Sequence, residues 1–577
     1  MSQKDIDGGE LLVKCLITEG VKYLFGITGA EILRIYDAIY RFGRDEGINT
    51  IMVRHEQGGT HAADAYARVS GDIGVCMGTV GPGFMHMVPA VATAWSDSIP
   101  LLVISAQVGK MFDNKGIIQG CLDQRAIIDP ITKAQITVEE PGEIPDAVQK
   151  AIKTAMSGRR GPVYLEFRET ALVRTADKTV LNKIKHPNEY RPKVKTRASE
   201  QELDSILDLL KEASKPIIIA GGGVIASEAS KELIELSNKY TIPAGTTING
   251  IGSISRNERT YFGSYLAMNM YRTAASNADL VLSFGCKWDH TVLFGDAPIW
   301  NQNQKIVQID IDPTEIGKNR SAEIGIVADA KSVINQLLAK MEKNLTKDKI
   351  TQWKKWNNSI QGNYNGDLKQ MNKLLESDKT PLIPQKLVLE IYNFFPSNTI
   401  YIIDGGDIMV FSHILISHFP RFPRGYLFPT AMGHLGVGIP YSIGAKLAKP
   451  DNPVVCISGD GSFLFNAQEL ETAVRYKIPI ICLISNNSCW SMIKNNQKIN
   501  LGKRYCDVDL PYTNYAEIAK SYGCYAEKIT DYKELKGAFK RAIDAKMPAV
   551  IDIDTSIEET PAIKLLTIYK RSKGLYG

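Results

Sequence analysis

The stretch GDGSFLFNAQELETAVRYKIPIICLISNN, residues 459–487, decides the fold of this sequence. It follows the apolar run VVCIS, contains a helical pattern, and ends in a second apolar run, IICLIS. Parallel strands joined by a right-handed helical crossover end at the same edge of a sheet, about 5 Å apart when they are neighbours. Asp460 and Asn487 then reach one ion with carboxylate and amide oxygens, which suit Mg²⁺ better than zinc or copper. The stretch therefore predicts a parallel sheet with a magnesium site at its edge.

The glycines of the same motif predict an anion beside the metal. Gly461 and Ser462 begin the following helix, where backbone N–H groups can bind phosphate oxygens. Taken singly, Gly-Asp-Gly after a strand is typical of a turn, and Asn-Asn is typical of a helix cap. Their place at the two ends of one crossover favours the site. No Walker A motif is present, and no GxGxxG motif with an acid at the right distance follows a strand, so the ligand is expected to be another kind of diphosphate.

The rest of the chain predicts three α/β domains, each with a mainly parallel sheet and helices on both faces. Short β-branched runs alternate with longer helical patterns in each of three blocks. Two charged, Pro-containing stretches, at about 177–196 and 343–381, are interpreted as linkers. The expected domains cover residues 1–180, 197–342 and 382–577.

The first and third domains are predicted to be related by duplication. TVGPGFMHMVPAVATAWSDSIPLLVIS, from Thr79, matches ISGDGSFLFNAQELETAVRYKIPIICLIS, from Ile457, in the order of its glycines, helix, Ile-Pro and strand. Upstream, TGAEILRIYDAI from Thr28 matches GGDIMVFSHILI from Gly405. Pro82 stands in the first copy where Asp460 stands in the third.

Composition indicates a soluble, cytoplasmic protein that acts on small molecules. The 577 residues carry a net charge of only +5, with basic and acidic residues interleaved, so nucleic acid is not an expected partner. No apolar run approaches the roughly 20 residues of a membrane span, and the N-terminus lacks a signal pattern. Nine cysteines without a CxxC pair fit neither a disulfide framework nor a zinc site.

The motifs resemble those of thiamin-diphosphate enzymes of the acetolactate synthase-like family. The Gly-Asp-Gly to Asn-Asn stretch resembles the family's diphosphate motif, and RHEQGGTHAADAYARVSG resembles the segment with its catalytic glutamate. With TVGPGF, MGHLGVGIPYSIGAKLA and IVQIDIDPTEIGKNR, the resemblance covers nearly the whole chain. It implies thiamin diphosphate and Mg²⁺ as cofactors, and a homodimer or homotetramer with active sites between subunits.

The resemblance also implies roles for individual residues. Glu56 is the expected catalytic acid, which hydrogen-bonds the cofactor's pyrimidine and supports its proton transfer. Leu435 is the expected apolar wedge beneath the cofactor. The Gly433 carbonyl is expected to accept a hydrogen bond from the cofactor's amino group. His55 and His61 are predicted to be structural. The other expected cofactor-binding residues are Gly406, Asp407, Gly461, Ser462 and Met492, and the expected metal ligands are Asp460, Asn487 and the backbone oxygen of Cys489.

Several residues depart from the synthase pattern and resemble benzaldehyde lyase instead. Gln119 stands in the segment where synthases carry Phe, and Asn496 replaces a synthase Trp, while Trp490 matches the lyase pattern. Glu31, where lyase-like enzymes commonly carry His, is a candidate proton donor or acceptor, with a solvated helix acid as the alternative. The expected function is cleavage or carboligation of a 2-oxo acid or acyloin, through an enamine intermediate.

Other activities in the same family stay open as alternatives. WDHTVLFGDAPIW, from Trp288, and the basic C-terminal tail resemble 2-hydroxyacyl-CoA lyases and oxalyl-CoA decarboxylases. GGGVIASEASKEL resembles the central region that holds FAD in synthases and ADP in oxalyl-CoA decarboxylase. A flavin-dependent pyruvate oxidase and a catalytically silent regulatory homologue complete the alternatives.

Overall fold

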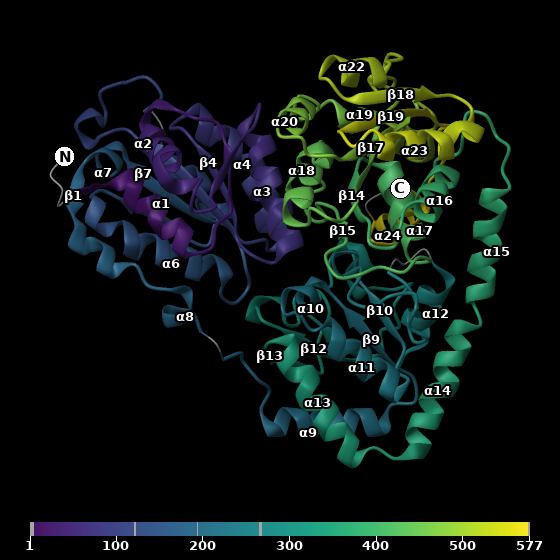
Figure 1. Cartoon of the computed structure of the whole chain (residues 1–577). Helices are drawn as coiled ribbons and strands as arrows, with labels where there is room; N and C mark the ends of the chain where they lie inside the picture. Colours follow the sequence, from purple (N-terminus) through teal and green to yellow (C-terminus); the bar gives the residue numbers. More distant parts are fainter. Residues whose placement is uncertain (1–4, 121–122, 193, 265–267, 575–577) are drawn as a thin grey trace.

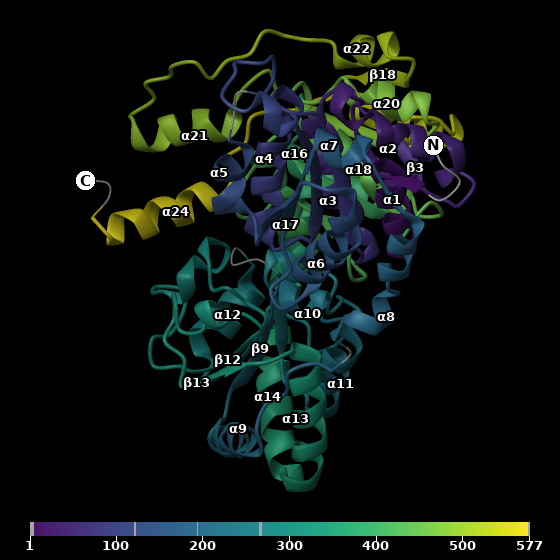
Figure 2. The same cartoon turned by 90° about the vertical axis from the view of Figure 1, so that its left-hand side faces the viewer.

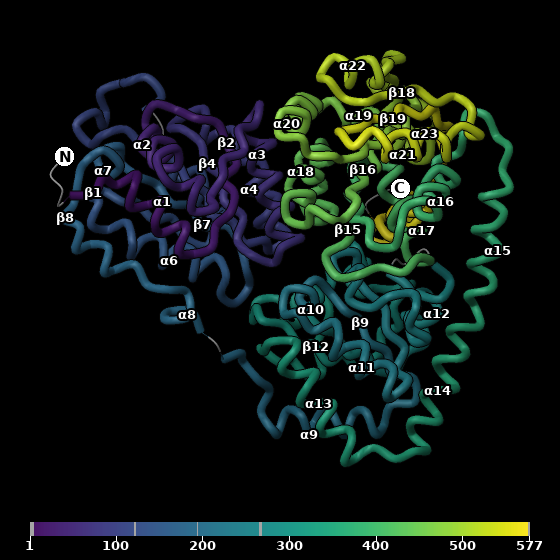
Figure 3. Tube along the Cα trace, in the orientation of Figure 1, coloured from purple at the N-terminus to yellow at the C-terminus, as the bar shows by residue number. Residues whose placement is uncertain are grey.

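The chain forms three α/β domains, each with a mainly parallel sheet between helices (Figures 1 and 3). The computed structural model describes residues 5–120, 123–192, 194–264 and 268–574. Figure 1 shows the N-terminal domain beside the C-terminal domain, with the central domain below them. The expected fold class, three parallel α/β domains, is confirmed.

The N-terminal domain has a six-stranded parallel sheet. Its two edge strands are Asn49–Met52 and Gln135–Val138. In spatial order its strands are β3 (Asn49–Met52), β2 (Tyr23–Gly26), β4 (Gly74–Gly78), β5 (Leu101–Gln107), β7 (Val163–Arg168) and β6 (Gln135–Val138). A separate antiparallel pair joins β1 (Asp5–Asp7) to β8 (Thr175–Asp177). The helices are α1 (Gly8–Thr18), α2 (Leu33–Ala38), α3 (Glu56–Ser70), α4 (Pro82–Asp97), α5 (Gln124–Ile128), α6 (Ile144–Met156) and α7 (Glu169–Val173).

The C-terminal domain repeats this strand order. Its parallel sheet runs β15 (Tyr426–Leu427), β14 (Ile400–Asp404), β16 (Val454–Gly459), β17 (Ile481–Asn486), β19 (Ala549–Asp554) and β18 (Tyr525–Ile529). Numbered along each chain segment, both sheets have the order 2-1-3-4-6-5, so the predicted relation between the two domains is confirmed. The helices are α16 (Pro384–Phe394), α17 (Asp407–Ile416), α18 (Gly438–Ala448), α19 (Asp460–Phe463), α20 (Glu469–Arg475), α21 (Ser491–Asn500), α22 (Tyr515–Ser521), α23 (Leu535–Asp544) and α24 (Pro561–Ser572).

The central domain has a five-stranded parallel sheet of a different order. From edge to edge its strands are β10 (Ala244–Thr246), β9 (Pro216–Ala220), β11 (Leu280–Phe284), β12 (Lys305–Asp310) and β13 (Ile324–Val327). Its helices are α9 (Glu200–Glu212), α10 (Gly222–Ala226), α11 (Ser230–Tyr240), α12 (Asn269–Asn277) and α13 (Ala330–Asn344).

The linker expected over residues 343–381 is wrong, because most of it is helical. It contains α14 (Lys347–Gln361) and α15 (Tyr364–Leu375). Trp353, Trp356 and Ile360 of α14 are buried against the central domain, and the Trp353 indole donates to the Ala213 carbonyl at 3.0 Å. Their spacing of three and four residues is typical of a helix. The pattern was missed because these apolar residues are few and most of their neighbours are Lys and Asn. The first expected linker contains only short elements, including α8 (Pro187–Tyr190).

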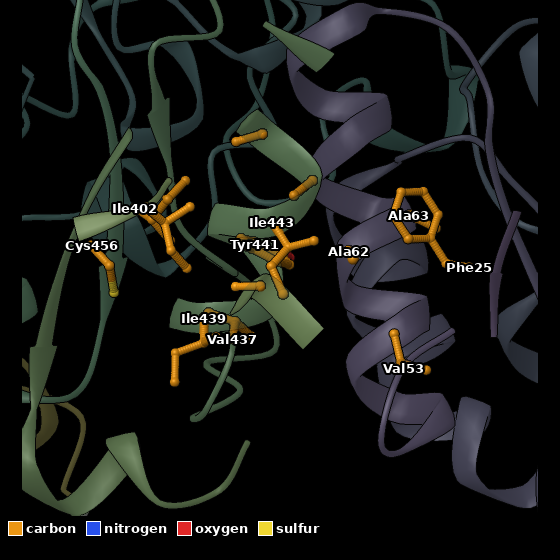
Figure 4. Packing of buried hydrophobic residues seen from close by; sticks show 14 of the residues in the cluster. Phe25, Val53, Ala62, Ala63, Ile402, Val437, Ile439, Tyr441, Ile443 and Cys456 are labelled. Carbon is orange, nitrogen blue, oxygen red and sulfur yellow. The ribbon is translucent and has the colours of Figure 1, made fainter. Parts of the chain in front are cut away.

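The N-terminal and C-terminal domains meet where α3 packs against α18. A Cβ atom added to Gly444 of α18 would lie 2.0 Å from the Ala62 carbonyl oxygen of α3, so the two backbones are in close contact. Figure 4 shows the apolar side chains along this contact, with Ile443 of α18 turned toward α3. Arg68 donates to Asp64 and, together with the Tyr441 hydroxyl, satisfies its buried carboxylate. The two related domains therefore bury one continuous apolar core.

The C-terminal helix α24 extends along one side of the molecule beside α21 (Figure 2). The Tyr569 hydroxyl donates to Asp296 Oδ2 of the central domain at 3.0 Å, and Lys573 pairs with the same carboxylate at 2.9 Å. Among the helices of the described ranges, none is long and apolar enough to span a membrane.

Candidate active site

The predicted metal ligands lie together at the carboxyl edge of the C-terminal sheet. Strands β16 and β17 are hydrogen-bonded neighbours, with Gly459 opposite Ser485, so the residues that follow each strand are adjacent. Asp460 is buried, and its Oδ2 accepts the Cys489 backbone N–H at 3.3 Å. Burial raises the pKa of Asp460 to about 6, so its carboxylate is still mostly ionised at neutral pH.

Asn487 supplies the observation that tests whether a cation fits here. Its Oδ1 atom is buried and has no hydrogen-bond partner among the described residues. A buried oxygen without a partner is unfavourable unless another group, such as a cation, satisfies it. Burial raises the pKa of the Cys489 thiol to about 11, so no thiolate competes to select a softer metal. The oxygen donors in this cluster fit Mg²⁺.

The expected diphosphate-binding residues surround the same edge. A Cβ atom at Gly406 would lie 3.1 Å from the Met492 Cβ, so α21 packs tightly against the start of α17. The Ser462 hydroxyl donates to the Gly459 carbonyl at 3.0 Å. The Gly461 N–H donates to Asp460 Oδ1 at 2.9 Å, and therefore orients the carboxylate in addition to any role toward an anion.

Asp407 is the most unusual member of this group. It is buried in the first turn of α17, and its Oδ2 accepts from the Asn495 amide of α21 at 3.0 Å. Its Oδ1 is buried without a partner among the described residues, and burial raises its pKa to about 6. Asn495 also donates to the Glu558 carbonyl at 2.9 Å, so this pair links α17, α21 and the start of the C-terminal tail.

The loop with Gly433 and Leu435 is held by buried polar groups. Asp404, at the end of β14, accepts the backbone N–H groups of Gly436 and Gly438, both at 3.0 Å. The neighbouring His434 ring contacts the N-terminal domain, through Gln57 Nε2 and Thr93 Oγ1, both at 3.1 Å. The half-buried Leu435 is thus fixed between two anchored residues.

The three predicted catalytic residues lie around one loop of the N-terminal domain, residues 79–83. The Thr79 hydroxyl donates to Glu31 Oε2 at 2.6 Å. Gln119 has a left-handed backbone (φ 65°) and packs against Gly81. A Cβ atom at Gly83 would lie 3.3 Å from Glu56 Oε1. The TVGPG loop, with its two glycines, is therefore the part that brings these residues together.

The start of α3, which carries Glu56, contacts the C-terminal domain at two points. Glu469 of α20 is buried and accepts the backbone N–H groups of Arg54 and His55, at 3.1 and 3.0 Å, just before Glu56. The Gln57 contact with His434 brings the start of α3 to the Leu435 loop. The prediction that the halves of a site belong to different subunits stays a prediction.

Comparison with known proteins agrees with this geometry. Three family models match the chain: the N-terminal thiamine pyrophosphate (TPP) binding domain over residues 6–127, the central domain over 203–337, and the C-terminal TPP binding domain over 404–553. The chain belongs to the thiamine pyrophosphate enzymes. The probable acetolactate synthase large subunit of Methanocaldococcus jannaschii is 36% identical, covering 95% of this chain and 91% of its own length. That of Methanococcus aeolicus is 33% identical (97% and 94%), and the acetolactate synthase large subunit of Haemophilus influenzae is 32% identical (96% and 95%).

This thiamin-diphosphate enzyme also contains site residues that the sequence reasoning missed. Asp404 directly precedes the Gly-Gly of TIYIIDGG, and an acid at a strand end before glycines is a signal for a loop support. Glu469 lacks such a signal, because its partners lie more than 400 residues away. Gln124 is the buried support of the TVGPG loop, since its Oε1 accepts the Gly81 N–H at 2.8 Å. His86 contacts Glu56 directly, at 2.9 Å.

Proposed function

We propose that this enzyme makes or breaks a C–C bond next to a carbonyl group, with thiamin diphosphate and Mg²⁺ bound and a 2-oxo acid or acyloin as donor. The observation that carries the proposal is the buried, unpartnered Asn487 Oδ1 beside the buried Asp460, at the carboxyl edge of the C-terminal sheet. The names of the acetolactate synthase relatives support carboligation as the direction.

Each residue has a role in this proposal. Asp460, Asn487 and the Cys489 carbonyl would hold Mg²⁺, and the first turns of α17 and α19 would hold the diphosphate. Bound thiamin diphosphate supplies an electron sink for the carbon next to the carbonyl. Glu56 Oε1, which has no hydrogen-bond partner among the described residues, would hold and release a proton at the cofactor's pyrimidine. Leu435 and the Gly433 carbonyl would fix the cofactor's orientation.

Glu31 and Gln119 are the proposed substrate-side residues. Both contact the TVGPG loop, which Glu56 also approaches at Gly83. Glu31 accepts from Thr79 and can exchange a proton, whereas Gln119 can only donate or accept hydrogen bonds. We therefore assign proton transfer near the reacting carbon to Glu31 and substrate orientation to Gln119.

A product screen tests the function. The protein is incubated with thiamin diphosphate and Mg²⁺ and separately with pyruvate, benzoin and a 2-hydroxyacyl-CoA, and products are identified by mass spectrometry. We expect acetolactate or another acyloin from pyruvate, or aldehyde from benzoin. Turnover of the CoA ester alone would contradict the proposal and favour the lyase of CoA esters.

The CoA lyase or oxalyl-CoA decarboxylase-like alternative has weaker support. It relies on the C-terminal cations to bind CoA phosphates. Lys564 already pairs with Glu559 at 3.0 Å, and Lys573 pairs with Asp296 at 2.9 Å. Helix α24 does contact the central segment that resembles those enzymes, because Tyr569 and Phe294 have ring centroids 5.8 Å apart.

A cavity of about 480 Å³ between the domains supports a nucleotide in the central domain. Gly222 and Gly223 at the start of α10 line it together with Lys287 and with Asp310 at the end of β12, which would accept from a ribose hydroxyl. FAD and ADP both fit this chemistry. A yellow protein with a flavin spectrum would identify FAD, and it would open the pyruvate oxidase alternative if oxygen is consumed with pyruvate.

A homodimer or homotetramer with shared sites completes the proposal. Exposed apolar side chains stand next to site residues in the sequence of both domains, including Met85 and Ile118 in one and Met432, Leu464 and Phe465 in the other. Exposed apolar side chains near a site favour burial by another subunit. Light scattering after gel filtration measures the mass, and a monomer at micromolar concentration would contradict this part.

A further inference from the structure

The Glu56 carboxylate has a second partner that its proposed role does not require. His86 Nδ1 lies 2.9 Å from Glu56 Oε2. The Glu56 side chain is 9% exposed, whereas that of His86 is 45% exposed. His86 therefore joins a nearly buried carboxylate to solvent.

The position of the His86 ring is determined by three elements. Glu56 begins α3, and His86 lies one turn into α4, directly after the TVGPG loop. The His55 ring stacks on the His86 ring, with centroids 4.3 Å apart and an interplanar angle of 28°. His55 is itself fixed as the N-cap of α3, because its Nδ1 accepts the Gln57 N–H at 3.2 Å. The stacked pair thus has a fixed inner ring and a half-exposed outer ring.

The two Glu56 oxygens have separate surroundings. Oε2 is bonded to His86, while Oε1 faces Gly83. An atom bonded to Oε1 therefore leaves the His86 hydrogen bond intact. An ionised Glu56 can only accept, so in that state His86 is the donor and its proton lies on Nδ1. Its other nitrogen, Nε2, has no hydrogen-bond partner in the part of the chain that the structure describes.

We propose that His86 is a positioning residue through which Glu56 exchanges its proton with solvent, while His55 holds the His86 ring in place. The inference rests on the proposed role of Glu56. To load Glu56, the Nδ1–H bond breaks as an Oε2–H bond forms, and Nε2 takes a proton from a hydronium ion, which becomes water. Rotation of the neutral carboxyl group then brings the proton to the Oε1 side. To unload it, the same two transfers run in reverse. One proton enters for each one that leaves, and no oxidant or reductant is involved.

His55 and Tyr36 are the other titratable groups that interact electrostatically with this pair. The protonation of the His86 ring is therefore measured separately from turnover. The first measurement needs neither cofactor nor turnover. Nitrogen-15 NMR of histidine-labelled protein without ligands reports which ring nitrogen carries the proton, and the His86 signal is assigned by its loss in His86→Asn. We expect the Nδ1–H form in the wild type and a return toward the Nε2–H form in Glu56→Gln. An Nε2–H form in the wild type would overturn the proposal.

The second measurement is turnover of the holoenzyme with the donor that the product screen identifies. His86→Asn keeps a hydrogen-bond donor beside Glu56 but cannot carry a proton through, so we expect kcat to fall at least about tenfold with unchanged cofactor affinity. In His86→Ala, added imidazole is expected to restore turnover in a dose-dependent way. The exposed His290→Asn is the matched control and should match the wild type.

The outcomes separate this inference from the proposed function. A wild-type kcat in His86→Asn, or no imidazole response in His86→Ala, contradicts the role of His86 while leaving the function in place. A wild type that turns over none of the donors contradicts the function, and the NMR result then still decides whether His86 donates to Glu56.

Discussion

The N-terminal and C-terminal domains share a strand order, and in each of them a helix follows the third strand along the chain within three residues. After β16 that helix begins with the buried Asp460, which accepts backbone N–H groups from Gly461 and Cys489. After β4 the matching position holds Pro82, which is exposed and starts α4. The same backbone edge therefore has a buried carboxylate in one domain and an uncharged loop in the other.

A second pair of matching helices shows the opposite distribution of chemistry. Helix α3 starts with the acid Glu56, whereas α18 starts with Gly438, behind the Leu435 loop. Because α3 and α18 pack together, the start of α3 comes to the loop with His434 in the other domain. The comparison indicates that the duplicated backbone positions the site, and that single residues at helix starts divide its functions between the two domains.

Removal of the acid is the strongest way to break this division. Glu56→Gln keeps the shape and the His86 contact but cannot release a proton, so we expect kcat to fall about 10²- to 10⁴-fold. Turnover is measured with saturating thiamin diphosphate and Mg²⁺. Glu471→Gln, which removes a surface partner of Arg475, is the control and should keep full activity. Full turnover in Glu56→Gln would show that the acid lies elsewhere.

Removal of the metal ligand tests the other domain. Asp460→Ala loses the one carboxylate of the cluster, so Mg²⁺-dependent binding of thiamin diphosphate should weaken on the order of 100-fold, or about 2.7 kcal/mol. Isothermal titration calorimetry measures this affinity. Adding Pro82→Asp to the same protein should restore nothing, because the first domain lacks the Asn487 and Cys489 oxygens. Unchanged affinity in Asp460→Ala would disprove the metal site.

Much of the fold and half of the site could be predicted from the sequence, because the signals there are local. Gly-Asp-Gly and Asn-Asn mark the ends of adjacent strands, and parallel pairing alone brings Asp460 to Asn487. The duplication was visible because the glycines and the Ile-Pro pairs keep their order. These features depend on backbone geometry that short motifs determine.

The rest of the site could not be predicted, because it depends on contacts between distant segments. Glu469 accepts hydrogen bonds from residues 414 and 415 positions away in the sequence, and no local pattern links them. His86 and Glu56 lie on different helices with no local pattern that links them, so their contact depends on how α3 and α4 pack. Helix α14 was missed for a similar reason, since only the central domain shows what Trp353 packs against.

The bond between domains at Glu469 should depend on pH. Burial raises its pKa to about 7, from about 4.5 when exposed. A raised pKa means that the folded protein binds the proton of Glu469 more tightly than the unfolded chain does. The stability that this proton contributes is therefore complete below pH 4.5 and is lost as the pH rises through 7. We expect the free energy of unfolding to depend less on pH in Glu469→Gln than in the wild type. Across this window the wild type should lose up to about 3 kcal/mol more than the variant. Urea denaturation of both proteins at several pH values measures it, and parallel pH profiles would contradict it.

The close contact of α3 and α18 gives the smallest expected effect and the sharpest control. Gly444→Ala places a methyl group 2.0 Å from the Ala62 carbonyl oxygen, so the helices must separate, and we expect a loss of about 1–3 kcal/mol. Gly366→Ala, in the exposed part of α15, meets no atom within 4 Å and should stabilise the protein by up to about 1 kcal/mol through helix propensity. The two variants therefore change denaturation midpoints in opposite directions. Because α3 also carries Glu56, the separation in Gly444→Ala should lower turnover as well, while Gly366→Ala should not. Equal stabilities would mean that the two related domains are not joined by this helix pair.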